Sequence, residues 1–144
     1  MKNRIKLYAL IIVAATSTLF FVQCGGGDDA ASNDPMKNKG IGPVKTVTIG
    51  EIDQTMAAEG KEIFDSKCSA CHKMESKYIG PMLKGVTERR TPEWIMNMIL
   101  NPEEMLKKDP IAKQLMKEYS APMANQGIKQ DEARKILEYF RTVK

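Results

Sequence analysis

Two of the three cysteines and the only histidine lie together in the segment Cys68-Ser69-Ala70-Cys71-His72. Thiolates and imidazole bind soft metal ions and take part in redox chemistry, so this cluster is a candidate functional site. A zinc site needs about four ligands, and only three candidates cluster here. A thioredoxin-like motif requires a βαβ setting, which the surrounding sequence does not offer. A structural disulfide would leave the adjacent histidine unexplained.

The spacing C-x-x-C-H is the signature of haem attachment. In this arrangement each thiol adds across one of the two vinyl groups on the porphyrin edge. Two intervening residues allow both sulfurs to reach their vinyls, and the next residue places its imidazole under the iron. The sequence therefore predicts one covalent haem c, attached through Cys68 and Cys71, with His72 as an axial ligand.

The elements that must position this segment follow a helical pattern from residue 53 onward. Asp53 is expected to cap a first helix that leads into Cys68. A last helix is predicted over about residues 130–142, with a buried stripe formed by Ala133, Ile136, Leu137 and Phe140.

Three further helices share one start signal, a capping residue followed by proline. Proline suits the first helical position because its missing N–H had no partner there. The three starts are Thr91-Pro92, Asn101-Pro102 and Asp109-Pro110. The helix that begins at Asn101-Pro102 is expected to be short, about one turn. The sequence thus predicts an all-α domain over residues 53–144.

Residues 1–23 have the composition of a signal peptide. Positive charges precede a mostly apolar run from Leu7 to Val22, which is shorter than the about twenty residues of a membrane-spanning helix. The sequence that ends in Gln23-Cys24 resembles the lipobox of bacterial lipoproteins, in which the cysteine carries the lipid. We therefore expect export and lipidation at Cys24. A plain signal peptide or an uncleaved anchor, with an incidental Cys24, is the alternative.

Residues 24–52 are expected to be a flexible, lipid-anchored linker. From residue 25 this segment is rich in Gly, Asp, Ala, Ser, Asn and Pro and lacks a helical period. Its last part, residues 44–50, alternates enough to suggest a short extended arm. That arm belongs either to the linker or to a clasp on the domain surface.

The charge balance gives no reason to expect nucleic-acid binding. The formal net charge is +4, but without Lys2, Arg4 and Lys6 of the removable segment the 22 basic residues fall to 19, against 18 acidic ones. Nucleic-acid binding would call for a clustered basic face. Aromatic residues are few, and a small domain with a thin core usually needs a staple, a metal or a cofactor.

Residues 54–144 resemble the class I c-type cytochromes, whose motifs occur here in the family's order. Gly60 and Phe64 resemble the Gly-x-x-x-Phe/Tyr motif of the first helix, and Tyr139 resembles the aromatic residue that crosses Gly60. Pro81 resembles the proline whose carbonyl accepts the imidazole N–H of the axial histidine. The resemblance implies a small fold of about four to five helices around one haem.

Met123 is the expected sixth ligand of the iron. His72 is the only histidine, so a second histidine ligand within the chain is excluded and methionine, lysine or an open site remain. The other methionines lie in predicted helices, close behind His72, or in the segments before residue 53. Met123 lies in a loop just before the last helix, where the family places its axial methionine.

The helix that begins near Trp94 is expected to form a wall of the haem pocket, with the Trp94 indole donating to a haem propionate or to a backbone carbonyl.

If His72 and Met123 occupy both axial positions of the haem iron, the protein is predicted to be a one-electron carrier rather than an enzyme. Export and lipidation at Cys24 would place it on the periplasmic side of a bacterial membrane. Methionine raises the potential relative to harder ligands. Redox partners would be proteins such as a quinol-oxidising complex, a terminal oxidase or a nitrogen-oxide reductase. An acidic partner could be steered by basic residues that follow the haem motif densely, with Glu75 and Glu88 among them: Lys67, Lys73, Lys77, Lys84, Arg89 and Arg90. A peroxidase-like enzyme or a haem-based sensor with an open sixth position is the alternative.

Overall fold

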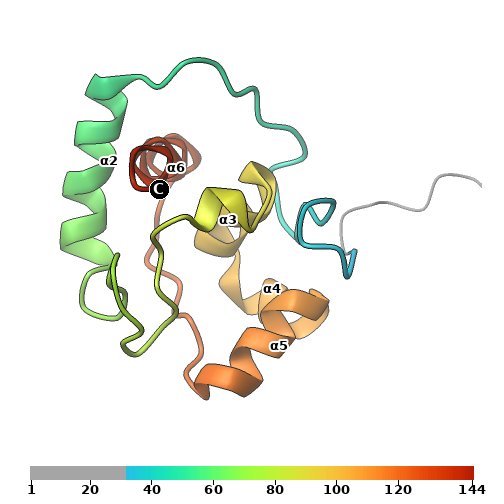
Figure 1. Ribbon diagram of the computed structural model, residues 1–144. Coiled ribbons are helices and arrows are strands. Elements are labelled where there is room, and N and C mark those ends of the chain that lie inside the picture. Colours follow the sequence, from blue (N-terminus) through green and yellow to red (C-terminus); the bar gives the residue numbers. More distant parts are fainter. Residues whose placement is uncertain (1–31) are drawn as a thin grey trace, which may run out of the picture.

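The computed structural model describes residues 32–144, and in this part of the chain it is helical, without strands (Figure 1). The elements are α2 (Gln54–Lys67), a 3₁₀ turn η2 (Val86–Glu88), α3 (Pro92–Leu100), α4 (Pro102–Lys108), α5 (Pro110–Tyr119) and α6 (Gln130–Thr142). The predicted all-α fold of about four to five helices is confirmed, with five α-helices in residues 32–144. The predicted signal peptide (residues 1–23) and Cys24 lie outside the described residues.

Local capping explains where the helices begin. Asp53, Thr91 and Asp109 each accept a hydrogen bond at their side chain from the third residue that follows, as N-caps do. Asn101 makes no such bond, although proline follows it. The start signals therefore predicted all three proline-led helices, but α4 has seven residues rather than a single turn.

Helices α2 and α6 cross in close contact, and Gly60 permits it. A Cβ atom at Gly60 would overlap the carbonyl oxygen of Lys135 in α6. The predicted close approach of the first and last helices at Gly60 is therefore present, and the atoms nearest to Gly60 belong to the α6 backbone at Lys135 and Ile136. Tyr139 lies one turn further along and packs on Phe64, with ring centroids 5.7 Å apart.

The buried stripe of α6 forms the centre of the core. Ala133, Ile136 and Leu137 are fully buried and Phe140 is 5% exposed, as the helical period predicted. Phe140 meets Phe64 of α2 edge to face at 5.9 Å, a favoured aromatic geometry. Helix α3 packs on the same core, so α2, α3 and α6 together form the frame of the molecule.

Residues 38–47 fall in the range expected to be a flexible linker, but they pack against the helices as an ordered arm. Val44 is 3% exposed, and Asn38 is fully buried. Asn97 of α3 accepts the Val44 N–H at 2.9 Å, and its amide group donates to the carbonyls of Lys39 and Val44, both at 2.9 Å. The polar composition of this segment predicted a linker, but hydrogen bonds from Asn97 and the burial of Val44 in the core hold it on the domain.

In Figure 1 the arm passes beside α3 and leads over the top of the molecule to α2. Residues 44–50 thus correspond to the clasp alternative of the sequence analysis. Across residues 32–144, no helix combines the length and apolar character needed to cross a membrane.

Candidate functional site

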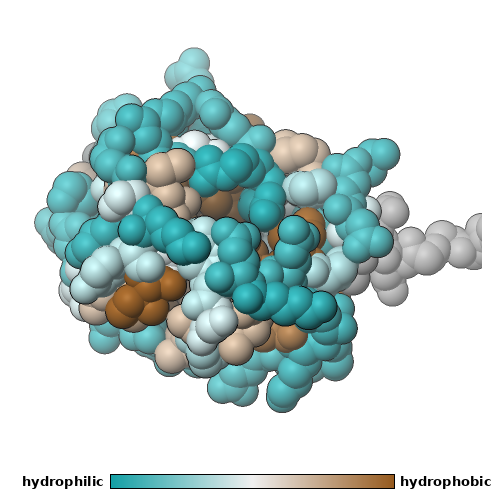
Figure 2. Space-filling model, turned by 60° about the horizontal axis from the view of Figure 1, so that its bottom comes forward, coloured by the Kyte–Doolittle hydropathy of each residue, from teal (hydrophilic) through white to brown (hydrophobic). Residues whose placement is uncertain are grey.

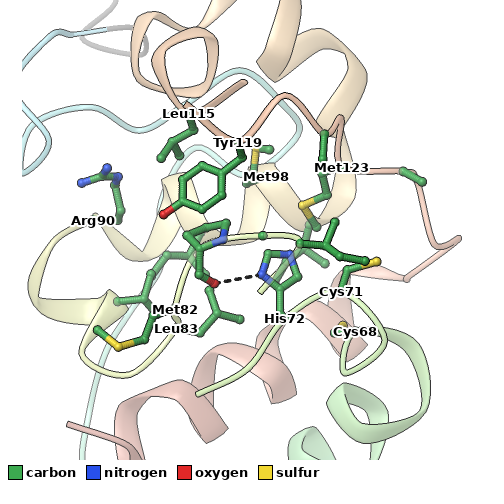
Figure 3. A pocket seen from close by; sticks show the side chains of 18 of the residues that line it. Cys68, Cys71, His72, Met82, Leu83, Arg90, Met98, Leu115, Tyr119 and Met123 are labelled. Atoms are coloured by element: carbon green, nitrogen blue, oxygen red, sulfur yellow. Dashed lines mark hydrogen bonds between the residues drawn. The ribbon is translucent and has the colours of Figure 1, made fainter. Parts of the chain in front are cut away.

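A cavity of about 480 Å³ opens between the segment after α2, helices α3 and α5, and the loop before α6. Cys68, Cys71 and His72 line one side of it, while α3 contributes Trp94 and Ile95. Most of its other lining residues are apolar. Figure 3 shows that these side chains converge from several elements. The cavity has the size and composition of a cofactor pocket.

The two cysteines are free thiols at one end of the cavity. The N–H groups of Cys71 and His72 both donate to the carbonyl of Cys68, at 3.1 and 3.0 Å, so the motif forms a compact turn after α2. Cys68 is half-buried and Cys71 exposed. Burial, reinforced by Cys71, raises the pKa of the Cys68 thiol to about 11. A thiol that stays protonated at neutral pH is a poor redox nucleophile.

His72 is oriented by the residues that follow it. Its Nδ1 lies 3.2 Å from the carbonyl oxygen of Pro81, which confirms the predicted bond (Figure 3). Because a carbonyl only accepts, Nδ1 carries the proton and Nε2 keeps its lone pair. Burial lowers the pKa of His72 despite the opposing effect of Pro81, which favours the neutral ring. Gly80 lies against this ring, where a Cβ atom would overlap Cε1.

Met123 reaches the same cavity from the loop between α5 and α6. This loop begins at Ser120, whose left-handed conformation (φ 52°) ends α5. Figure 3 shows the Met123 thioether directed into the pocket from the side opposite His72. Three other methionines also line the cavity: Met82, Met98 and Met116. The structure therefore brings the predicted ligand pair to one cavity, together with competitors for the sixth position.

Trp94 does not have either of the two partners predicted for it. Its indole Nε1–H donates to Oδ1 of Asp109, at 3.1 Å, rather than to a backbone carbonyl or toward the cavity. Asp109 is fully buried and accepts a further bond from the Asn38 amide at 2.7 Å. Sequence reasoning saw Asp109 only as an N-cap, because its two other partners are distant in the chain.

These residues fit haem c. Two thiols at the motif spacing stand at one end of an apolar cavity, and a histidine with a fixed tautomer stands beside them. The sequence alone gave no role to Gly80. Its position directly before Pro81, the expected partner of His72, could have indicated that it lies against the His72 ring. Sequence reasoning also grouped Arg90 with the surface charges, although its half-buried side chain lines the cavity.

Comparisons with known proteins agree with this geometry. Residues 57–144 match the family model described as cytochrome c. A curated relative, the "Cytochrome c-553-like" protein of Synechocystis sp., is 34% identical over 34% of this chain. That match spans 59% of the relative's length, less than two thirds of it.

Solved structures give longer matches. A cytochrome c from Rhodothermus marinus is 44% identical, with a TM-score of 0.69 over 70% of this chain and 88% of its own. An engineered form of that protein, bound to a carbene intermediate, is also 44% identical, with a TM-score of 0.66 over the same shares. The cytochrome c domain of the pp3183 protein from Pseudomonas putida is 32% identical, with a TM-score of 0.54 over 58% of this chain and 85% of its own.

Proposed function

Since the chain belongs to the cytochrome c family, whose members bind haem c covalently, we propose that it is a one-electron carrier with His72 and Met123 as axial ligands. The observation that supports this proposal is the placement of both side chains in one apolar cavity, from opposite sides (Figure 3). When bound, the haem supplies the redox chemistry, because its iron cycles between two oxidation states. With both axial positions taken by protein side chains, no position remains for a substrate.

The residues of this chain would perform three tasks in that role. Cys68 and Cys71 hold the cofactor, and the Pro81 carbonyl holds the His72 ring in one orientation. Apolar side chains of α3 and α5 exclude water from the cavity, which favours fast electron exchange with little reorganisation. Met123, a weak thioether ligand, would raise the reduction potential relative to harder ligands.

A replacement of Met123 tests the proposal directly. Ferric wild type should show the weak sulfur-to-iron charge-transfer band at the red end of the spectrum, and Met123→Ala should lose it. The variant should also have a lower potential and should bind carbon monoxide when reduced, whereas reduced wild type should bind it poorly. Met98→Leu and Met116→Leu are matched controls and should keep the band. Loss of the band in a control but not in Met123→Ala would reject the assignment, and ready binding of carbon monoxide by wild type would favour a sensor or peroxidase.

A partly apolar face near the cavity supports docking of a redox partner. Tyr78, Ile79 and Met82 are 56%, 47% and 38% exposed. Figure 2 shows apolar islands among hydrophilic residues on the face that comes forward. Lys73 lies 5.2 Å from the ring centroid of Tyr78, so positive charge borders this surface. An acidic partner with an apolar centre matches it; a quinol-oxidising complex, a terminal oxidase and a nitrogen-oxide reductase are candidates.

We further propose that the protein is exported and held at the periplasmic side of a bacterial membrane by lipid on Cys24. The supporting evidence is the apolar leader followed by Gln23-Cys24. Several acyl chains, each contributing about 0.8 kcal/mol per buried CH₂, would anchor the protein firmly. Mass spectrometry of the mature protein should find diacylglycerol on an N-terminal Cys24. An unmodified N-terminus at a later residue would contradict the proposal.

A further inference from the structure

The start of the arm fixes the point at which the chain enters the folded domain. Asn38 is fully buried, and its side-chain amide donates to the Asp109 carboxylate at 2.7 Å and to the carbonyl of Ser32 at 2.6 Å. The carbonyl of Asn38 accepts from the Thr91 hydroxyl at 2.5 Å. The turn before the arm is closed by the carbonyl of Asp34, which accepts from the Asn38 N–H at 2.9 Å. The chain is therefore held on the domain from Ser32 onward.

Little chain remains between this entry point and Cys24, the proposed site of lipidation. Eight residue-to-residue steps lead from Cys24 to Ser32, and at about 3.6 Å each they span at most about 29 Å in any conformation. A free linker up to residue 52, as the composition predicted, would span up to about 100 Å. The packed arm thus keeps the domain close to its anchor.

The chain enters on the side of the domain that lies away from the haem attachment segment. In Figure 1 the described chain begins at the right, whereas α2 and the loop that follows it lie at the left and lower left. That loop carries Cys68 and Cys71, the expected attachment points of the haem. A domain of this size has a radius of about 17 Å, so half of its circumference is about 53 Å. A tether of about 29 Å covers only about half of that path, so this loop cannot be turned onto the membrane surface.

The face around the entry point suits a lipid surface. Met36 is 55% exposed, and with Lys37 and Lys39 it lines a shallow cavity between the start of the arm and the start of α3. An apolar side chain beside ammonium groups matches the headgroup level of a bilayer, where cations meet lipid phosphates. Lys37 pairs with Asp34 at 3.6 Å, but such an exposed pair contributes little and exchanges readily. Contacts of this kind are weak singly, so the short tether, and not this face, sets the orientation.

We propose that the arm orients the anchored domain by shortening its tether, with the face around Met36 toward the lipid and the loop of Cys68 and Cys71 toward the aqueous phase. The redox partners are then proteins whose redox group stands above the membrane, and quinol dissolved in the bilayer is not a direct donor. The inference rests on the lipid anchor of the proposed function and is independent of Met123.

Spin labels on the two sides of the domain test this orientation. Asn33→Cys and Glu62→Cys each place one nitroxide at an exposed position, the first beside the entry point and the second on α2. The lipidated, haem-loaded and reduced protein is placed in vesicles of phosphatidylethanolamine and phosphatidylglycerol, with and without nickel-chelating headgroups. Nickel should relax the label at residue 33 several-fold more than the label at residue 62, because magnetic relaxation falls steeply with distance. Equal relaxation of the two labels would overturn the proposal.

A spacer variant tests the tether as the cause. About twenty Gly and Ser residues inserted after residue 31 leave the described fold intact and extend the maximum span to about 100 Å, so the two labels should become nearly equal. The same spacer after Lys144 is the matched control and should preserve the difference. A difference that persists with the spacer after residue 31 would reject the short tether as its cause.

Flotation of the vesicles tests the anchor separately. Wild type that fails to float with the vesicles would reject the lipid on Cys24, and the inference with it. Protein that floats but carries equally relaxed labels would reject the orientation and leave the anchor intact.

Discussion

The absence of a Cβ atom at Gly80 leaves room for the ring of His72, the expected axial ligand. The Gly80 backbone lies against the His72 ring, so that no side chain fits between them. The carbonyl oxygen of the next residue, Pro81, then accepts a hydrogen bond from Nδ1–H of the same ring. Contact from one residue and a hydrogen bond from the next leave the imidazole a single orientation, which a directional metal bond requires.

Gly80→Ala should displace the His72 ring. Because the new methyl group would overlap Cε1, the ring or the loop must move, at a cost of about 1–3 kcal/mol. The expected results are a lower midpoint of thermal unfolding and a rise in the high-spin fraction of the absorption spectrum. Gly50→Ala is the matched control, since no atom lies within 4 Å of a Cβ there. Identical spectra for the two variants would show that the Gly80 contact does not constrain the ligand.

At the scale of elements, α6 organises the molecule through one buried carboxylate. The side chain of Glu138 is fully buried, where it receives ion pairs from Arg134 and Arg141 and a hydrogen bond from the Asp53 N–H at 2.9 Å. Arg141 also donates to the carbonyl of Gly50 at 2.6 Å. Glu138 thus connects α6 to the N-terminus of α2, and its partner Arg141 connects α6 to Gly50 in the segment that follows the arm.

Glu138 should make stability depend on pH. Burial alone would raise its pKa, but hydrogen bonds from Arg134, Asp53 and Arg141 outweigh burial and lower the pKa below the ordinary value of 4.5. A lowered pKa in the folded state means that its contribution is fully present above about pH 4.5 and is lost as the pH falls through the folded-state value. Glu138→Gln should therefore cost about 2 kcal/mol at pH 7 and progressively less below pH 4.5. Chemical denaturation at several pH values measures this difference; a difference that stays constant down to pH 3 would contradict the ionic role.

At the scale of the whole molecule, the arm extends the folded unit beyond the matched family region. The family match begins at residue 57, yet Asn38 and Val44 are buried against α3 and its neighbours. Asn38 donates to Asp109, which also accepts from the Trp94 indole of the cavity wall. The arm thereby joins the N-terminal part of the chain to the wall of the haem cavity.

Asn97→Ala should release the arm. The substitution removes three hydrogen bonds to arm backbone, two of them to Val44. Each bond contributes about 1 kcal/mol to stability, so we expect the free energy of unfolding to fall by about 2–3 kcal/mol. Trypsin should also cleave faster after Lys39 and Lys45. Thr48→Ala, at an exposed position directly after the arm, should change neither property. Unchanged cleavage in Asn97→Ala would mean that apolar contacts such as that of Val44 suffice to hold the arm.

The features that depend on neighbouring residues were readable from the sequence alone. Spacing identified the haem attachment segment, the caps identified the helix starts, and the helical period identified the buried stripe of α6. These rules act within a few residues, so tertiary contacts rarely overturn them. Even the bond from His72 to Pro81 spans only nine residues.

Contacts between distant segments were decided only by the tertiary structure. The crossing of α2 and α6 places Gly60 against the backbone of Lys135, and the Trp94 indole of α3 donates to Asp109, the residue that caps α5. Polar side chains of α3 turned a linker-like composition into a packed arm. The same packing turned Arg90 from a surface charge into part of the cavity wall. No local pattern encodes these pairings, because they depend on how helices cross and on which polar groups must find partners once buried.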